Sequence, residues 1–232
     1  MTPPPDFLPY ARHSFGEEEA AAAARVVLEG RISQGPAVAE FEARAAARCG
    51  AGFAVSVSSG TAALHLAFLA LELAPGDEVV VPALTFVATA NAVLLAGGTP
   101  VAADIDPVDL NLSAETARAR LSPRTRAICP VHFAGAPADL AALSRLASPR
   151  GIAVVEDAAQ ALGAEVRDAD LGWYRVGRPA RSRAVAFSLH PAKTISTGEG
   201  GLILTADPEL DRRLRQLRHH GLVLEPRRPA DH

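Results

Sequence analysis

Short apolar runs alternate with helical segments over most of this 232-residue chain, and this alternation constrains the fold more than any other feature. The runs that predict strands are residues 53–57, 78–81, 100–103, 127–131, 152–156, 184–187 and 202–205. Helices are predicted between them, at residues 61–73, 86–96, 114–121, 137–147 and 208–219. Continuous apolar runs are typical of strands buried on both faces, and parallel strands need crossover helices. The sequence therefore predicts an α/β fold, with a mostly parallel seven-stranded sheet sandwiched by helices.

Two more helices are predicted before the first strand. Ser14 and Glu17 have the spacing of a capping box ahead of an Ala-rich helix at 18–29, and Gly30 stands at its natural end. A second helix is predicted at 36–48, with a proline suited to its first position. After these helices, no repeat or linker suggests a domain boundary before about residue 222.

The composition indicates a globular protein whose overall charge favours no class of partner. Apolar residues make up 49% of the chain, which is ample for a core, and the net charge of −3 gives no bias toward nucleic acid or membranes. No apolar run reaches the roughly 18 residues of a membrane span, so we expect no membrane association and a cytoplasmic location. Cys49 and Cys129 lie in apolar surroundings without metal-ligand spacing, and we expect reduced core cysteines and no metal site.

Lys193 is the only lysine among the 23 lysines and arginines of the chain. Both residue types carry a surface charge, but only lysine has a primary amine that can lose its proton and form an imine. Lys193 lies in the stretch Ser-Leu-His-Pro-Ala-Lys-Thr-Ile-Ser-Thr-Gly-Glu-Gly-Gly, residues 188–201, whose glycines allow close approach to a ligand. The alternative is one solvated lysine left by drift in an arginine-rich sequence.

Other polar groups follow the predicted strands, at the edge where open α/β sheets bind ligands. Ser58-Ser59-Gly60-Thr61 opens a helix and offers backbone N–H groups to a phosphate, although Ser and Thr are also ordinary N-caps. Ser188, at the end of another strand, is a second candidate for a phosphate contact. Asp157, at the tip of an apolar strand, predicts a cationic partner such as a protonated pyridine nitrogen, the alternative being a helix cap.

Two further side chains accompany these groups. Phe86 is suited to stack on a flat heteroaromatic ring, the alternative being a core residue. Glu156, next to Asp157, is expected to face outward by strand alternation. Residues 163–183 are polar without a usable period, and we expect an irregular surface excursion there.

Together these motifs resemble those of the DegT/DnrJ-type sugar aminotransferases, fold-type I enzymes that use pyridoxal 5′-phosphate (PLP). The resemblance runs from about Ser14 to Gly221. It rests on the 188–201 stretch, Ser59-Gly60-Thr61-Ala62-Ala63-Leu64, Thr85-Phe86-Val87-Ala88-Thr89 and Glu156-Asp157-Ala158-Ala159-Gln160. It implies the large domain of such an enzyme, with residues 31–221 as the PLP-binding domain after an N-terminal segment and helix at 1–30.

The resemblance also implies a role for each candidate residue. Lys193 matches the lysine that holds the cofactor and moves the proton between cofactor and substrate carbon, and Asp157 the acid that meets the pyridine nitrogen. Phe86 matches the residue that stacks on the ring, and Gln160 the residue that contacts the ring hydroxyl. The phosphate cradle is matched by Gly60, Thr61 and Ser188.

The implied reaction moves an amino group from glutamate to a keto group of a nucleotide-linked sugar, in surface-glycan or related amino-sugar biosynthesis. The form His190-Pro191-Ala192-Lys193 resembles the branch that acts on 4-keto sugars. His190 itself is a candidate for the substrate pocket, or a solvated loop residue. A homodimer is implied for the full-length form.

Two departures from the family pattern open alternatives. Family members continue beyond the segment matched by Arg218-His219-His220-Gly221 into a smaller C-terminal domain, so we expect residues 222–232 to begin a linker to a missing domain. The segment 167–183 also lacks the usual Gly-Ser pattern. One alternative is therefore a truncated, inactive PLP-binding or interaction domain. Another is a PLP-dependent sugar dehydratase, against which Lys193 argues because that group has a histidine in its place.

Two readings outside this family are weaker. A nucleotide-binding reductase would need a glycine fingerprint after the first strand, where residues 58–61 have a single glycine. Nucleic-acid binding would rest on the arginines near the C-terminus, the alternative being a solvated helix face. These arginines are Arg212, Arg213, Arg215, Arg218, Arg227 and Arg228.

Overall fold

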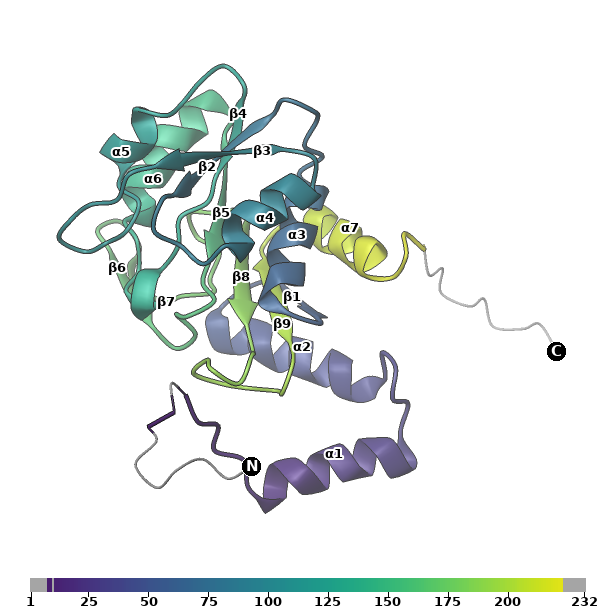
Figure 1. Ribbon diagram of the computed structural model, residues 1–232. Helices are drawn as coiled ribbons and strands as arrows, with labels where there is room; N and C mark the ends of the chain where they lie inside the picture. Colours follow the sequence, from purple (N-terminus) through teal and green to yellow (C-terminus); the bar gives the residue numbers. More distant parts are fainter. Residues whose placement is uncertain (1–7, 10, 223–232) are drawn as a thin grey trace.

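The computed structural model describes residues 8–9 and 11–222 (Figure 1). Of the expected linker at 222–232, all but Leu222 lies outside the described residues, as do Arg227 and Arg228. One sheet has seven strands in the order β1-β9-β8-β5-β4-β2-β3. These strands are β1 (Phe53–Val57), β2 (Glu78–Pro82), β3 (Thr99–Ala103), β4 (Thr125–Ile128), β5 (Ala153–Asp157), β8 (Ala184–Ser188) and β9 (Gly201–Thr205).

The direction of the strands decides which loops meet. β8, β5, β4, β2 and β3 pair in parallel, whereas β9 is antiparallel to both β1 and β8. The predicted mostly parallel seven-stranded sheet is therefore confirmed. Because β9 runs against its neighbours, its first residue lies at the same edge as the carboxyl ends of β1, β2, β5 and β8.

Helices cover both faces of the sheet. The helices α3 (Gly60–Ala70), α4 (Ala88–Leu95) and α7 (Pro208–Arg218) pack on one face, in a core that includes Cys129. The opposite face is covered by α2 (Pro36–Cys49), α5 (Ala114–Arg118) and α6 (Leu140–Ala147). Alternate residues of a strand enter different cores, since Val155 faces the first and Val154 the second. Both cysteines are buried, as predicted.

The N-terminal helix α1 (Glu17–Glu29) begins differently from the expectation. Its N-cap is Gly16, whose backbone N–H donates to Glu19 Oε2 at 2.7 Å, so the predicted pairing of Ser14 with Glu17 is wrong. The helix lies apart from the sheet at the lower edge of Figure 1. Among the described residues, no helix combines the length and the apolar character needed to cross a membrane.

The segment predicted as an irregular excursion contains a β-hairpin, made of β6 (Glu165–Asp168) and β7 (Gly172–Arg175). Val166 and Tyr174, which face each other across it, are buried against α2 and β8. The prediction failed because each strand has four residues and buries few of them, too short a pattern to show a period.

Other differences concern element boundaries. β4 ends at Ile128 rather than at residue 131, because Val131 joins β5 only through an isolated bridge to Asp157. The helix expected at 137–147 begins at Leu140, after Asp139 caps it by accepting the N–H of Ala142 at 2.9 Å. Short 3-10 turns lie on either side of this helix, η1 (Phe133–Gly135) and η2 (Ser148–Arg150).

Candidate active site

The carboxyl ends of β1, β2, β5 and β8 surround a cavity of about 400 Å³ at one edge of the sheet. The loop from β8 to β9 forms another wall, because β9 starts at this same edge. Every residue predicted for the site lines the cavity. These residues are Gly60, Thr61, Phe86, Asp157, Gln160, Ser188, His190 and Lys193. The sheet thus gathers side chains from distant parts of the chain, while their roles stay predictions.

One end of the cavity is formed by the start of α3. Ser59 caps this helix, since its Oγ accepts the N–H of Ala62 at 3.0 Å, and the helix begins at Gly60. A Cβ on Gly60 would lie 2.7 Å from Ser188 Cβ, and one on Gly201 would lie 2.1 Å from the Ser59 carbonyl oxygen, so only glycine fits at either position. Unpaired N–H groups and the positive end of the helix dipole suit this end of the cavity to an anion such as a phosphate.

Asp157 lies at the closed side of the cavity with 5% of its surface exposed. Thr89 Oγ1 donates to its Oδ2 at 2.7 Å, and the Ala159 N–H donates to its Oδ1 at 3.1 Å. Burial raises the pKa of Asp157, and these two hydrogen bonds oppose that rise only in part. The segment after Asp157 is a turn, so the alternative of a helix cap is wrong. A buried carboxyl of this kind is stabilised by a cationic group entering the cavity.

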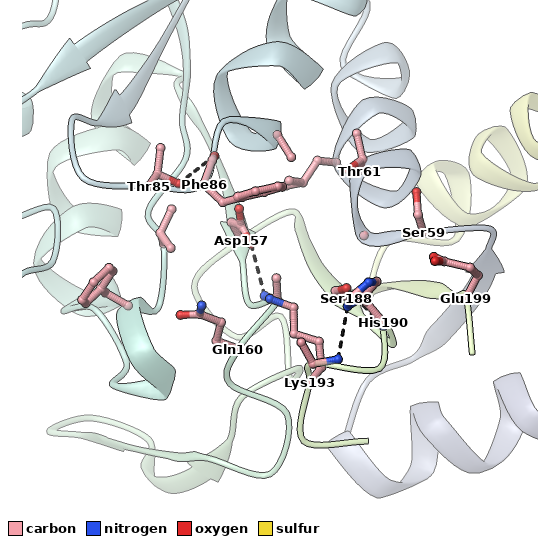
Figure 2. Close-up of a pocket in the computed structure, with 17 residues that line it drawn as sticks. Ser59, Thr61, Thr85, Phe86, Asp157, Gln160, Ser188, His190, Lys193 and Glu199 are labelled. Atoms are coloured by element: carbon pink, nitrogen blue, oxygen red, sulfur yellow. Dashed lines mark hydrogen bonds between the residues drawn. The ribbon is translucent and has the colours of Figure 1, made fainter. Parts of the chain in front are cut away.

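Figure 2 shows how the remaining side chains surround this carboxyl. In that view Asp157 lies between Phe86 and Lys193, and Gln160 lies beside Lys193. Phe86 is 74% exposed, so its interpretation as a core residue is wrong. Lys193 and Asp157 line the same cavity. A flat ring between them can therefore meet an aromatic face, a carboxyl and an amine together.

Lys193 lies in the turns between β8 and β9. Its backbone N–H donates to the His190 carbonyl oxygen at 2.9 Å, and the Ala192 N–H donates to His190 Nδ1 at 3.1 Å. Because Nδ1 accepts a hydrogen bond, the proton of a neutral His190 ring is on Nε2. His190 is thus an N–H donor at the cavity wall. Lys193 is half-buried there, which disfavours its reading as a solvated remnant.

Glu156 does not face solvent as expected. Its side chain is 1% exposed and accepts hydrogen bonds from the hydroxyl of Ser182 and from His132 Nε2, the latter at 2.8 Å. His132 Nδ1 accepts the Ala138 N–H at 3.0 Å, which leaves its proton on Nε2. Glu156 points away from Asp157, as alternation requires, but the sheet face it points to is covered by other elements.

A comparison with protein-family models decides the family. Residues 13–231 match the model of the DegT/DnrJ/EryC1/StrS aminotransferase family. The chain belongs to this family. The predicted resemblance is confirmed by that match.

Solved structures of similar proteins have the same fold. DesV of S. venezuelae, solved in complex with a ketimine intermediate, is 42% identical, with a TM-score of 0.83 over 93% of this chain and 55% of that chain. The sugar aminotransferase CalS13 of Micromonospora echinospora is 34% identical, with a TM-score of 0.83 over 91% and 57%. NtdA of Bacillus subtilis, solved with bound cofactor PMP, is 31% identical, with a TM-score of 0.78 over 86% and 44%. This family member therefore spans about half the length of these proteins.

Several residues at the cavity were not singled out from the sequence. Thr89 holds Asp157, and its Oγ1 also lies 2.6 Å from Thr85 Oγ1. Thr85 lies in a bend before α4, so this contact depends on the local turn and not on helical spacing. Phe133 and Glu199 also line the cavity. Nothing in the local sequence sets these two apart.

Proposed function

We propose that this chain forms the PLP-binding part of an aminotransferase that moves an amino group from glutamate to a nucleotide-linked keto sugar. The observation that carries the proposal is one cavity with a helix N-terminus at one end, the buried Asp157 at its closed side and the only lysine of the chain in its wall. Membership of an aminotransferase family supports the reaction class. We propose C4 as the position of the keto group, because the motif from His190 to Lys193 resembles that of the branch acting on 4-keto sugars.

The shape and chemistry of the cavity fit PLP. The glycines at the start of α3 leave room for a phosphate against backbone N–H groups, with Thr61 and Ser188 beside them. Asp157 would meet the pyridine nitrogen, Phe86 would cover a ring face and Gln160 would contact the ring hydroxyl. PLP, when bound, supplies an aldehyde that condenses with amines and a ring that withdraws electrons from the reacting carbon.

The chain's own residues would then divide the work. Lys193 Nζ would hold the cofactor in the resting enzyme. Once displaced by the donor amine, it would move a proton from the donor's α-carbon to the cofactor and, in the second half of the reaction, from the cofactor to the sugar carbon. The Asp157 carboxylate, held by Thr89, keeps a proton on the nitrogen facing it. His190 Nε2–H is placed to donate to a substrate oxygen. The position of Lys193, Asp157 and His190 at the cavity supports these roles, and each can be tested separately.

We further propose a homodimer for the full-length form. Phe86, Val87, Leu94 and Leu95, on and just before α4, are all more than half exposed and give an apolar surface beside the cavity. The same proposal includes the division of the chain into an N-terminal segment up to about residue 30, a PLP-binding domain up to about residue 221 and a linker after it. A PLP-binding domain that does not turn over by itself is the second candidate, because this chain spans 55% and 57% of the two solved structures.

The first experiment follows the absorbance of the chain with PLP before and after glutamate is added. Borohydride reduction and peptide mapping are then expected to place the cofactor on Lys193. Lys193→Arg keeps the charge but removes the reactive amine, so we expect no covalent adduct and no turnover. Adduct formation in that variant would contradict the proposal.

A matched control adds a second lysine outside the cavity. Arg44→Lys puts an amine on a side chain that is 80% exposed, and we expect reduction to label Lys193 alone in that variant. A cofactor absorbance band that glutamate leaves unchanged would favour the inactive domain. Offering 3-keto and 4-keto sugar nucleotides in parallel tests the position of the keto group.

A further inference from the structure

The amide of Gln160 is held in one orientation by a turn that comes from elsewhere in the chain. The Ala134 N–H, in η1, donates to Gln160 Oε1 at 2.8 Å. The oxygen of the amide is therefore engaged, and its NH₂ group is left as the donor on the cavity side. If the amide were flipped, its NH₂ would face the N–H of Ala134. Both groups are donors, so no hydrogen bond could form between them. The turn thus decides which end of Gln160 a ligand meets.

This turn has a backbone conformation that its sequence does not favour. Ala134 has φ 50° and ψ 23°, in the left-handed region that residues with a Cβ rarely adopt. Gly135 follows with φ 88°, and a Cβ there would lie 3.1 Å from the Gln160 carbonyl oxygen. Conformations of this kind persist only where the surroundings impose them, and they gather at functional sites.

Asn111, which does not line the cavity, holds the turn in this conformation through hydrogen bonds. This residue is 2% exposed, in the loop between β3 and α5. Its Oδ1 accepts the Phe133 N–H at 3.0 Å, and its Nδ2 donates to the Ala136 carbonyl oxygen at 3.2 Å. One side chain thus holds the turn on both sides of Ala134 and Gly135. Asn111 is itself fixed, since its backbone N–H donates to Asp109 Oδ1 at 2.9 Å.

We propose that Asn111 is a positioning residue for the reaction, which it serves by keeping the Phe133–Ala136 turn in the conformation that aims the NH₂ of Gln160 at the cofactor ring hydroxyl. The part concerning the ring rests on the proposed function. The same turn has a second effect on the site. Phe133 and Ala134 also line an adjoining cavity of about 340 Å³, together with Lys193, so the turn forms part of the wall beside the catalytic amine.

The cofactor-free chain tests the positioning itself. Asn111→Ala removes both bonds to the turn, and we expect hydrogen exchange at the Ala134 amide to rise about tenfold, as for the loss of one or two hydrogen bonds. The side-chain NH₂ resonances of Gln160 are expected to shift or broaden. Unchanged exchange and unchanged resonances would overturn the proposal, whether or not the chain binds PLP.

The control is a variant that loses the same number of hydrogen bonds between a side chain and the backbone, at the opposite edge of the sheet. Thr205 is fully buried, donates to the Arg183 carbonyl oxygen at 2.8 Å and accepts the Asp207 N–H at 3.1 Å. Thr205→Val therefore also loses two hydrogen bonds between a side chain and the backbone. We expect it to lower Tm without changing exchange at Ala134. If Asn111→Ala does not fold, Asn111→Asp keeps the acceptor for Phe133 and is measured in its place.

The loaded chain tests the link to the cofactor. An N–H donor stabilises the form in which the ring oxygen carries full negative charge, so losing it raises the pH midpoint of the visible absorbance band, by about one unit. Gln160→Ala and Asn111→Ala are expected to raise this midpoint alike, and the double variant no further than Gln160→Ala alone. Additive shifts would overturn the link. A wild-type chain without any PLP band would instead refute the proposed function, and the exchange experiment would still decide the role of Asn111.

Discussion

Asp157 and Glu156 are neighbours in β5, both are buried, and their side chains meet different partners on opposite faces of the sheet. Glu156 receives hydrogen bonds from His132 and Ser182 on the covered face of the sheet. Asp157 receives bonds from Thr89 and a backbone N–H, and it also lines the cavity. The chain therefore keeps at Asp157 a buried acid whose charge a bound cation stabilises.

Asp157→Asn should separate stability from cofactor binding. Burial holds the pKa of Asp157 above the ordinary value of 3.8. At a pH between these two pKa values, Asp157 is therefore protonated in the folded chain and ionised in the unfolded chain. Stability from this group is greatest at low pH and falls as the pH rises from 3.8 through the folded pKa. Asparagine does not titrate, and its NH₂ can donate to Thr89. We expect the cofactor-free variant to be at least as stable as the wild type at pH 7.

The affinity of Asp157→Asn for PLP should fall about tenfold or more, because a hydrogen bond between charged groups is lost. Urea unfolding at pH 4 and pH 7, with PLP titrations of both proteins, measures the two effects. A variant less stable than the wild type at pH 7 and equally stable at pH 4 would contradict the role given to burial.

Residue roles could be predicted from the sequence where a motif carries them, and not where a tertiary contact does. Lys193 stood out as the only lysine, and Asp157 as an acid at the end of an apolar strand. Asn111 could not be found in this way, because its contacts to the Phe133–Ala136 turn exist only once β3 and β4 have brought two loops together. Thr89 is intermediate: it belongs to a motif that the sequence shows, but its hydrogen bond to Asp157 could not be predicted.

At the scale of elements, the hairpin of β6 and β7 is the part that the sequence did not predict. Its buried side chains, Val166 and Tyr174, give it a small apolar contact with the body of the domain. The ion pair of Arg181 with Asp168 holds it further, with a second bond from Arg181 to Asp170. The central strands β2, β8 and β9 were predictable because each buries both faces, whereas β6 buries alternate residues only.

Arg181→Met should loosen this hairpin while the main sheet stays folded. The hydrogen bonds from Arg181 hold the pKa of Asp168 well below its usual range, so the pair stabilises the fold above the ordinary pKa of 3.8 and less as the pH falls below it. We expect a lower Tm at pH 7 and a smaller difference at pH 3. Trp173, the only tryptophan, lies on β7 and reports the change through its fluorescence anisotropy.

The control for this variant is Arg183→Met, which breaks an exposed ion pair with Asp207 outside the hairpin. It should leave the anisotropy of Trp173 unchanged. Equal anisotropy in the wild type and in Arg181→Met would show that the apolar contact alone holds the hairpin.

At the scale of the whole molecule, Glu42 joins the two ends of the described chain. Its buried carboxylate accepts hydrogen bonds from Arg215 and Arg218 of α7 and from the Ser56 backbone N–H of β1. Two arginines that suggested a solvated or nucleic-acid-binding face are thus engaged within the fold. Helix α7 is thereby fastened to α2 across the first strand.

Glu42→Gln should destabilise the domain as a whole. Removing one partner of a buried ion pair costs about 3–5 kcal/mol, and the 38% exposure of the Arg215 side chain lowers our expectation to about 2 kcal/mol. Glu40→Gln, on the same helix, breaks only an exposed pair with Arg44 and should cost less than about 0.5 kcal/mol. Urea unfolding of both variants measures the difference, and equal costs would contradict the role of Glu42.

The antiparallel course of β9 also limits how this chain can vary in length. Ser188 and Gly201 pair with each other, so the loop that carries Lys193 is tied at both ends, and β9 is held on its other side by β1. A shift of β9 by one residue would break its register with two neighbours and exchange Leu202 and Ile203 between the two cores. Natural relatives should therefore keep the pairing of Ser188 with Gly201, whereas the turn of the hairpin at 169–171 is free to lengthen.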